Sequence, residues 1–216
     1  MMAVLRYALL KSMRDGSLVA FALGPVIMVG AAVLGIALFA RGTHTYPLTI
    51  TPEWSAARTA AEIAPVNMFI GAVFACLAGF WSFRGEVVSK SMGAFILAVR
   101  PISIQTATTI FGATAGFAGY IATSVVLLAL TASLPPHPIQ LAVETAFLCL
   151  CAAAGGSLAV TISTEAWAII PLYLSGVIAM PWLIKARGFL PILIAVVLTM
   201  AFIATSTLLL RRRCAT

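Results

Sequence analysis

Long unbroken runs of apolar residues constrain this chain more than any other feature. The first, residues 17–40, reads SLVAFALGPVIMVGAAVLGIALFA and contains no charged residue. A helix needs about 20 apolar residues to cross the hydrocarbon core of a bilayer. In that core every backbone N–H and C=O group must be paired inside the protein, so only helices or closed barrels cross it. Barrel strands alternate apolar and polar residues, and these runs do not. The sequence therefore predicts an all-α integral membrane protein.

The composition supports the same class of protein. Of the 216 residues, 62% are hydrophobic and 9% are charged, whereas about a quarter of the residues of a soluble domain are charged. The net charge of +7 could suggest a nucleic-acid partner. However, the basic residues are scattered between the apolar runs, where they carry information about topology. We therefore expect the lipid bilayer, and no nucleic acid, as a partner.

Six apolar runs are long enough to span, which predicts a six-transmembrane-helix bundle and a single transmembrane domain over residues 1–216. The spans are expected at residues 17–40, 64–81, 105–130, 139–162, 166–183 and 189–210. With the N-terminus inside, the cytoplasmic cations are Arg6, Lys11, Arg14, Arg84, Lys90, Arg100, Arg211, Arg212 and Arg213, and the outer ones are Arg41, Arg58, Lys185 and Arg187. This asymmetry predicts cytoplasmic N- and C-termini in the plasma membrane, which in a bacterium is the inner membrane.

Residues 1–15 are expected to form an amphipathic helix in the membrane interface. Its apolar arc holds Met2, Leu5, Leu9 and Met13, and its opposite side holds Lys11, Arg14 and Asp15. Such a helix places its apolar arc in the acyl boundary and its cations among the headgroups. Two interpretations are open: a simple anchor for the first span, or a helix that also braces a cytoplasmic partner.

A second amphipathic segment, residues 83–100, is expected as a short cytoplasmic helix between spans 2 and 3. Its apolar stripe consists of Val88, Met92, Phe95 and Val99. Glu86 and Lys90 lie on the other side at i, i+4 spacing, and Pro101 ends the helix or kinks it into the third span. The segment is either a docking helix for another protein or a solvated loop helix.

This plan resembles the ABC-2 type permeases, the membrane subunits of ATP-driven exporters. In that family the loop has an acidic residue, a glycine, and an apolar run that ends in proline, an aliphatic residue and serine. Glu86, Gly93, residues 95–97 (FIL) and residues 101–103 (PIS) stand in those places. Pro171 and the Leu-Ser-Gly of residues 174–176 resemble the fifth span of the family. Residues 87–92, VVSKSM, carry fewer charges than the family has before its glycine.

The resemblance implies an exporter in which this chain pairs with a second permease, either a copy or a paralogue, and with two ATPase subunits. Its loop helix would then be the coupling element, through Glu86, Val88, Met92, Phe95 and Val99. The chain has no Gly-x-x-x-x-Gly-Lys-Ser/Thr phosphate loop, so ATP and Mg²⁺ would bind in the partner ATPase. We expect no cofactor and no enzyme activity in this chain alone. The alternatives are a structural or regulatory membrane subunit that transports nothing, or a secondary transporter.

Several other residues have two interpretations each. Glu144 lies inside the fourth predicted span, where carboxylates are costly and often functional. It either contacts a substrate or a cation, or reaches the outer interface. Gly112 and Gly116 form a GxxxG pattern that brings helices close, within one subunit or between two.

The histidines lack ligand spacing, so no metal site is expected. The cysteines are interpreted as small packing residues.

Overall fold

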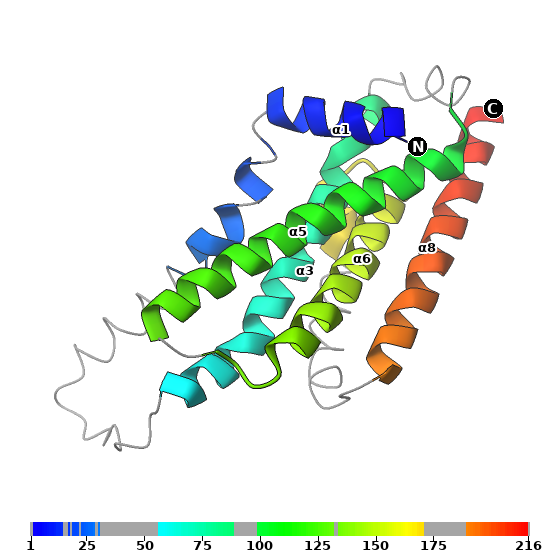
Figure 1. Cartoon of the computed structure of the whole chain (residues 1–216). Helices are drawn as coiled ribbons and strands as arrows, with labels where there is room; N and C mark the ends of the chain where they lie inside the picture. The colour runs from blue at the N-terminus through cyan, green and yellow to red at the C-terminus, as the bar shows by residue number, and fades with distance from the viewer. Residues whose placement is uncertain are drawn as a thin grey trace.

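The computed structural model describes residues 2–14, 17, 19–21, 23–28, 30, 56–88, 99–131, 134–170 and 189–215. Regular structure in this part of the chain is entirely helical, which confirms the all-α prediction. The elements are α1 (Met2–Arg14), α3 (Ala56–Val88), α5 (Pro101–Thr131), α6 (Pro138–Ile162), the 3-10 helix η1 (Ala166–Ile169) and α8 (Phe189–Ala215). Figure 1 shows α3, α5, α6 and α8 as long helices, with α1 across one end of them.

Four helices among the described residues are long and apolar enough to cross a membrane. The candidate spans are Ile63–Gly85, Pro101–Ala129, Pro138–Ile162 and Phe189–Arg212. They correspond to the second, third, fourth and sixth predicted spans. Most of the first and fifth predicted spans, residues 17–40 and 166–183, lies outside the described residues, so the count of six stays a prediction. The described start of the fifth is the short 3-10 helix η1.

Proline marks the start of two of these helices. α5 begins at Pro101 and α6 at Pro138, because the first helical position needs no N–H donor and favours the φ angle that proline imposes. The carbonyl of Arg100 accepts the first bond of α5, from the N–H of Ser103 at 2.9 Å. His137 precedes α6 in a left-handed conformation with φ 55°, so it turns the chain sharply between α5 and α6.

The prediction of a separate short helix over residues 83–100 is wrong at both described ends of that segment. α3 runs without interruption to Val88, so residues 83–88 form its last turns. Val99 and Arg100 are not helical, and residues 89–98 lie outside the described residues. Polar residues do not stop a helix that a long apolar run has already nucleated, which is why α3 continues past its spanning part.

Small residues hold α3, α5 and α6 together. A Cβ atom on Gly79 of α3 would meet the carbonyl of Ala153 on α6, and a Cβ on Gly156 of α6 would meet the carbonyl of Cys76 on α3. Gly112 and Gly116 of α5 face α3 in the same way. Close backbone approach at small residues is the usual basis of helix packing in lipid. The GxxxG pattern is therefore used inside this chain.

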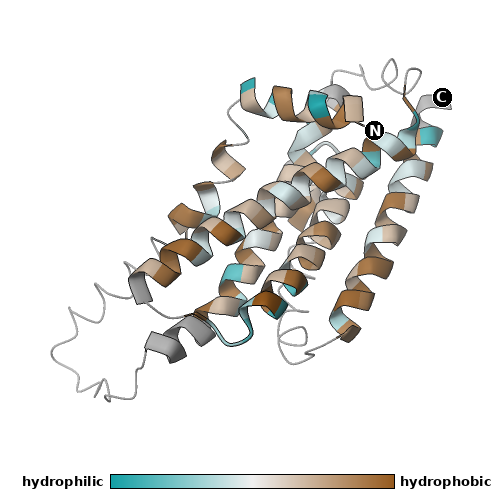
Figure 2. Ribbon diagram, in the orientation of Figure 1, coloured by the Kyte–Doolittle hydropathy of each residue, from teal (hydrophilic) through white to brown (hydrophobic). Residues whose placement is uncertain are grey.

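α8 lies at the edge of this group. About 11% of its candidate span is buried, compared with 50% to 56% for the other three. Large apolar side chains cover its surface, including Val197 and Met200, and Figure 2 shows it as mostly hydrophobic along its length. Such a surface is suited to contact with lipid or with another membrane subunit.

Candidate functional site

The two termini lie at the same end of the bundle (Figure 1). We call this the basic end. Its described cations are Arg6, Lys11, Arg14, Arg84, Arg100, Arg211 and Arg212. They come from α1, from the last turns of α3, from the start of α5 and from the end of α8. Because the helices bring these charges together from distant parts of the sequence, the basic end is the strongest candidate for a functional surface.

α1 presents two different faces at the basic end. Val4, Ala8 and Ser12, spaced four residues apart, are buried, and the first two belong to the same apolar core as Ile104 of α5 and Leu210 of α8. Three of the four residues of the predicted apolar arc point elsewhere: Met2, Leu9 and Met13 are 75%, 42% and 60% exposed. The fourth, Leu5, is partly buried and packs against this core. The helix therefore packs on the protein mainly through small residues and leaves several large apolar side chains exposed, a pattern that suits a helix in the membrane interface.

Arg84 ties the last turns of α3 to the turn that follows α6. Its Nε donates to the carbonyl oxygen of Thr164 at 2.8 Å, and its guanidinium lies 4.8 Å from the ring centre of Trp81. Ser163 caps the end of α6 through its N–H, which donates to the carbonyl of Ala159. A cation from α3 therefore holds the turn after α6 in place.

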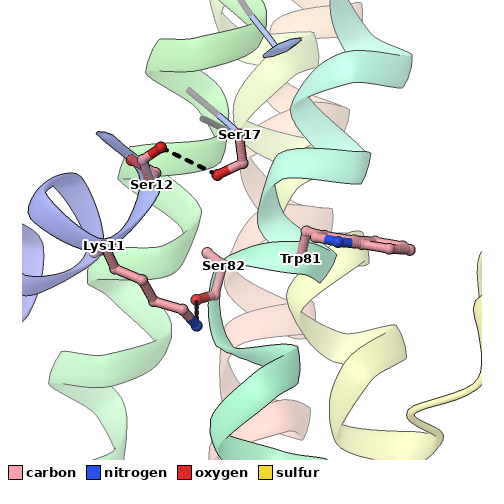
Figure 3. Close-up of a pocket in the computed structure, with 6 residues that line it drawn as sticks. Lys11, Ser12, Ser17, Trp81 and Ser82 are labelled. Carbon is pink, nitrogen blue, oxygen red and sulfur yellow. Dashed lines mark hydrogen bonds between the residues drawn. The ribbon is translucent and has the colours of Figure 1, made fainter. Parts of the chain in front are cut away.

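Lys11 ties α1 to α3. Its Nζ donates to the carbonyl oxygen of Ser82 at 3.1 Å. Between the two helices lies a cavity of about 170 Å³, lined by Ala8, Lys11, Ser12, Ser17, Trp81 and Ser82. Figure 3 shows Lys11 and the three serines around it, with the Trp81 ring directed away. The sequence placed Lys11 on the polar side of the first helix but gave no sign of its contact with Ser82.

The predicted coupling residues are partly within the described chain. Glu86 and Val88 lie on the last turn of α3; their side chains, and all of Met92 and Phe95, lie outside the described residues. Val99 is half-buried and packs against the core that α1 and α5 share. The described end of the stripe therefore contacts this protein's own core.

Glu144 lies at the opposite end, on the second turn of α6. It is half-buried, and its Oε1 accepts a hydrogen bond at 2.8 Å from the Nε2 of Gln140. Gln140 is exposed and lies one turn nearer the start of α6 at Pro138. Six residues of helix correspond to about 9 Å, so the carboxylate reaches the interface through its amide neighbour. This geometry favours the interface interpretation.

Sequence reasoning missed a buried amide, Asn67, inside α3. It is 2% exposed, and its Nδ2 donates to Ser124 Oγ at 2.9 Å and to the carbonyl of Tyr120 at 3.3 Å, both on α5. Its Oδ1 is buried without a hydrogen-bond partner among the described residues. A lone asparagine within an apolar run was the available signal. Buried polar groups of this kind usually bind an internal water molecule.

The described residues contain no cluster of metal ligands. Cys76, Cys149 and Cys151 are unpaired thiols in the spans, and the first two are buried. Cys149 belongs to the same packed group as Ala75 and Ala153, which agrees with a packing role.

Comparisons with models of protein families, with curated proteins and with solved structures found no match for this chain. The resemblance to ABC-2 permeases therefore depends on the motif residues described above.

Proposed function

We propose that this chain is the permease subunit of an ABC exporter. It would cross the plasma membrane six times with both termini in the cytoplasm, and would export its cargo with energy from separate ATPase subunits. The observation that supports this most is where α3 ends and where α5 begins. Both points lie at the basic end, beside the two termini (Figure 1), and the positive-inside rule favours the cytoplasm for an end rich in cations.

The packing between α3 and α5 is suited to transmitting force. Val88 ends α3 and Pro101 begins α5, on either side of residues 89–98. The spanning parts of these helices touch through Gly112 and Gly116 almost backbone to backbone. Tightly packed helices move together rather than deform. An ATPase that pushed on residues 89–98 would therefore move α3 and α5 as a unit.

α1 adds a second contact to the same mechanism. It shares a core with Phe83 and Ile104, one residue near each side of the connection. Its exposed apolar residues would meanwhile keep it in the membrane interface. In this proposal α1 braces the coupling region against the lipid, which is the second of its two interpretations.

The partner subunits follow from the proposal. The chain itself carries no phosphate loop, so an ATPase that binds ATP and Mg²⁺ would dock at the basic end. A second permease, either a copy or a paralogue, would complete the pathway between the subunits. The exposed apolar surface of α8 is available for that contact.

The test is co-purification followed by a functional measurement. The tagged chain is extracted from its native membrane in mild detergent, and co-purifying proteins are identified. We expect an ATPase with a phosphate loop, whose ATP hydrolysis changes when the chain is added back in proteoliposomes. A chain that purifies without such an ATPase, or leaves its hydrolysis unchanged, would contradict the proposal and favour a non-transporting subunit.

A further inference from the structure

The cavity between α1 and α3 has the size of a headgroup site. Its volume is about 170 Å³, whereas pockets for drug-sized ligands measure roughly 300–1,000 Å³. A water molecule occupies about 30 Å³ in the liquid, so the cavity has room for several waters or for one compact polar group. A small ionic group is therefore a better fit than a large organic ligand.

The cavity lies near the end of a candidate span, because Trp81 and Ser82 are among the last residues of Ile63–Gly85. Trp81 is 42% exposed, and tryptophan side chains favour the boundary between acyl chains and headgroups. Leu9 and Met13 of α1 are exposed, as apolar side chains in contact with acyl chains would be. This arrangement suits a ligand with its headgroup in the cavity and its chains in lipid.

Lys11 supplies positive charge to the cavity. Its Nζ is 3.1 Å from the carbonyl of Ser82 and 3.5 Å from the place where a Cβ on Gly85 would stand. The ammonium group has three protons, so contacts with the protein are compatible with binding a guest as well. Lysines near a membrane surface attract anionic lipids, and the phosphate of a lipid is the anion found at this depth.

The three serines indicate which hydrogen-bonding groups a ligand in the cavity would carry. The Ser12 hydroxyl donates to the carbonyl of Leu9, and the Ser82 hydroxyl to that of Gly79. The Ser17 hydroxyl is directed to the carbonyl of Ser12 at 3.5 Å. Each hydroxyl has one proton and two lone pairs. These oxygens can therefore accept hydrogen bonds from a guest, and a guest that carries hydroxyl groups would supply the donors.

We propose that this cavity binds an anionic phospholipid with a hydroxylated headgroup, of which phosphatidylglycerol is the simplest example. The phosphodiester lies at Lys11, and the glycerol hydroxyls donate to the serine oxygens. The proposal concerns lipid binding alone, so it stands or fails independently of the exporter proposal.

The test is native mass spectrometry of the full chain released from detergent micelles. Three lipids are compared: phosphatidylglycerol, phosphatidic acid, which is anionic without the headgroup glycerol, and phosphatidylcholine, which has no net charge. We expect the tightest binding for phosphatidylglycerol. Lys11→Gln should weaken it about fivefold, which corresponds to about 1 kcal/mol for one cation near the surface. Arg6→Gln is the matched control, because it removes the same charge from an exposed position of α1 outside the cavity.

A second variant tests the headgroup and keeps the lysine contact. Ser82→Ala leaves the backbone carbonyl that Lys11 binds, and should reduce the preference for phosphatidylglycerol over phosphatidic acid. Equal weakening by Lys11→Gln and Arg6→Gln would overturn the site, and equal binding of the two anionic lipids would overturn the headgroup assignment. Displacement of phosphatidylglycerol by inorganic phosphate alone would show a soluble anion site and would also overturn the proposal.

Discussion

The Lys11 ammonium donates to the carbonyl oxygen of Ser82, 71 residues further along the chain, at 3.1 Å. Two residues beyond Ser82, Arg84 donates to the carbonyl of Thr164. The last turns of α3 are thus held from one side by α1 and from the other by the turn after α6. Both donors are cations and both acceptors are backbone carbonyls, so substituting Lys11 or Arg84 removes the donor and leaves the acceptor in place.

The first prediction concerns the Arg84 contact. Arg84→Ala should lower the free energy of unfolding by about 1–3 kcal/mol, because a hydrogen bond from a charged donor and a ring contact are both lost. Arg100→Ala is the control: Arg100 is exposed, and we expect a change below about 0.5 kcal/mol. Denaturant titration of both variants in detergent measures the difference. Equal stability of the two variants would argue against the contact.

The second prediction concerns the helix contact at Gly156. Gly156→Ala should destabilise the protein by about 1–3 kcal/mol, because the added methyl group would meet the backbone of Cys76, which has little room to shift. Gly30→Ala is the matched control, since a Cβ there would meet nothing within 4 Å. Thermal unfolding in detergent should show a lower midpoint for the first variant only. An unchanged midpoint for Gly156→Ala would mean that α3 and α6 are further apart than described.

The third prediction concerns the buried amide. Asn67→Ala and Ser124→Ala should show a coupling of about 0.6 kcal/mol, and at most about 1.7, in a double-mutant cycle, as found for hydrogen bonds between membrane helices. Thr114→Ala replaces Ser124→Ala as the control, because the Thr114 hydroxyl donates within its own helix, to the carbonyl of Ile110. Denaturant titration gives the four stabilities that each cycle needs. Additive effects of Asn67→Ala and Ser124→Ala would show that their bond contributes nothing.

The fourth prediction concerns coupling. If an ATPase docks at the connection after α3, Glu86→Lys should reduce coupled ATP hydrolysis and export severalfold, because a charge at an interface rim tunes association. Insertion should be normal, since the position follows the last spanning residue, Gly85. Glu165→Lys makes the same charge change at an exposed site in the turn after α6. If both variants export normally, the docking surface does not include Glu86.

The fifth prediction concerns orientation. In intact cells, a membrane-impermeant thiol reagent should leave Cys214 unlabelled and should label it after permeabilisation. Leu134→Cys in a Cys214→Ser background is the control, because Leu134 is 57% exposed in the turn between α5 and α6 and should be labelled from outside. The reverse pattern would invert the topology.

The apolar length of the runs was enough to predict four of the helices, because in lipid the need to pair backbone groups dominates every local preference. The end of α3 was missed because FRGEVV, residues 83–88, is polar enough to look like a new segment, while its backbone simply continues a formed helix. A drop in hydropathy marks the membrane boundary and carries no signal for a helix end.

The site was harder to predict than the fold. The inward stripe of α1, with Val4, Ala8 and Ser12, is small and weakly apolar, so a helical wheel gives it less weight than the large outward residues. The face that packs is the one that shares a core with Phe83 and Ile104, and these residues belong to helices far away in sequence. The Lys11 contact is invisible for the same reason, since any backbone carbonyl could have been its acceptor.

The contacts of Gly79 with Ala153 and of Gly156 with Cys76 limit how this protein can change shape. Each glycine lies directly against a backbone carbonyl of the other helix. Sliding α3 along α6 by a single residue, about 1.5 Å of rise, would bring a side chain against that carbonyl, with no space to receive it. Shear between these two helices is therefore blocked. Among the described helices, a large conformational change would therefore keep α3 and α6 in register and move other helices relative to this pair.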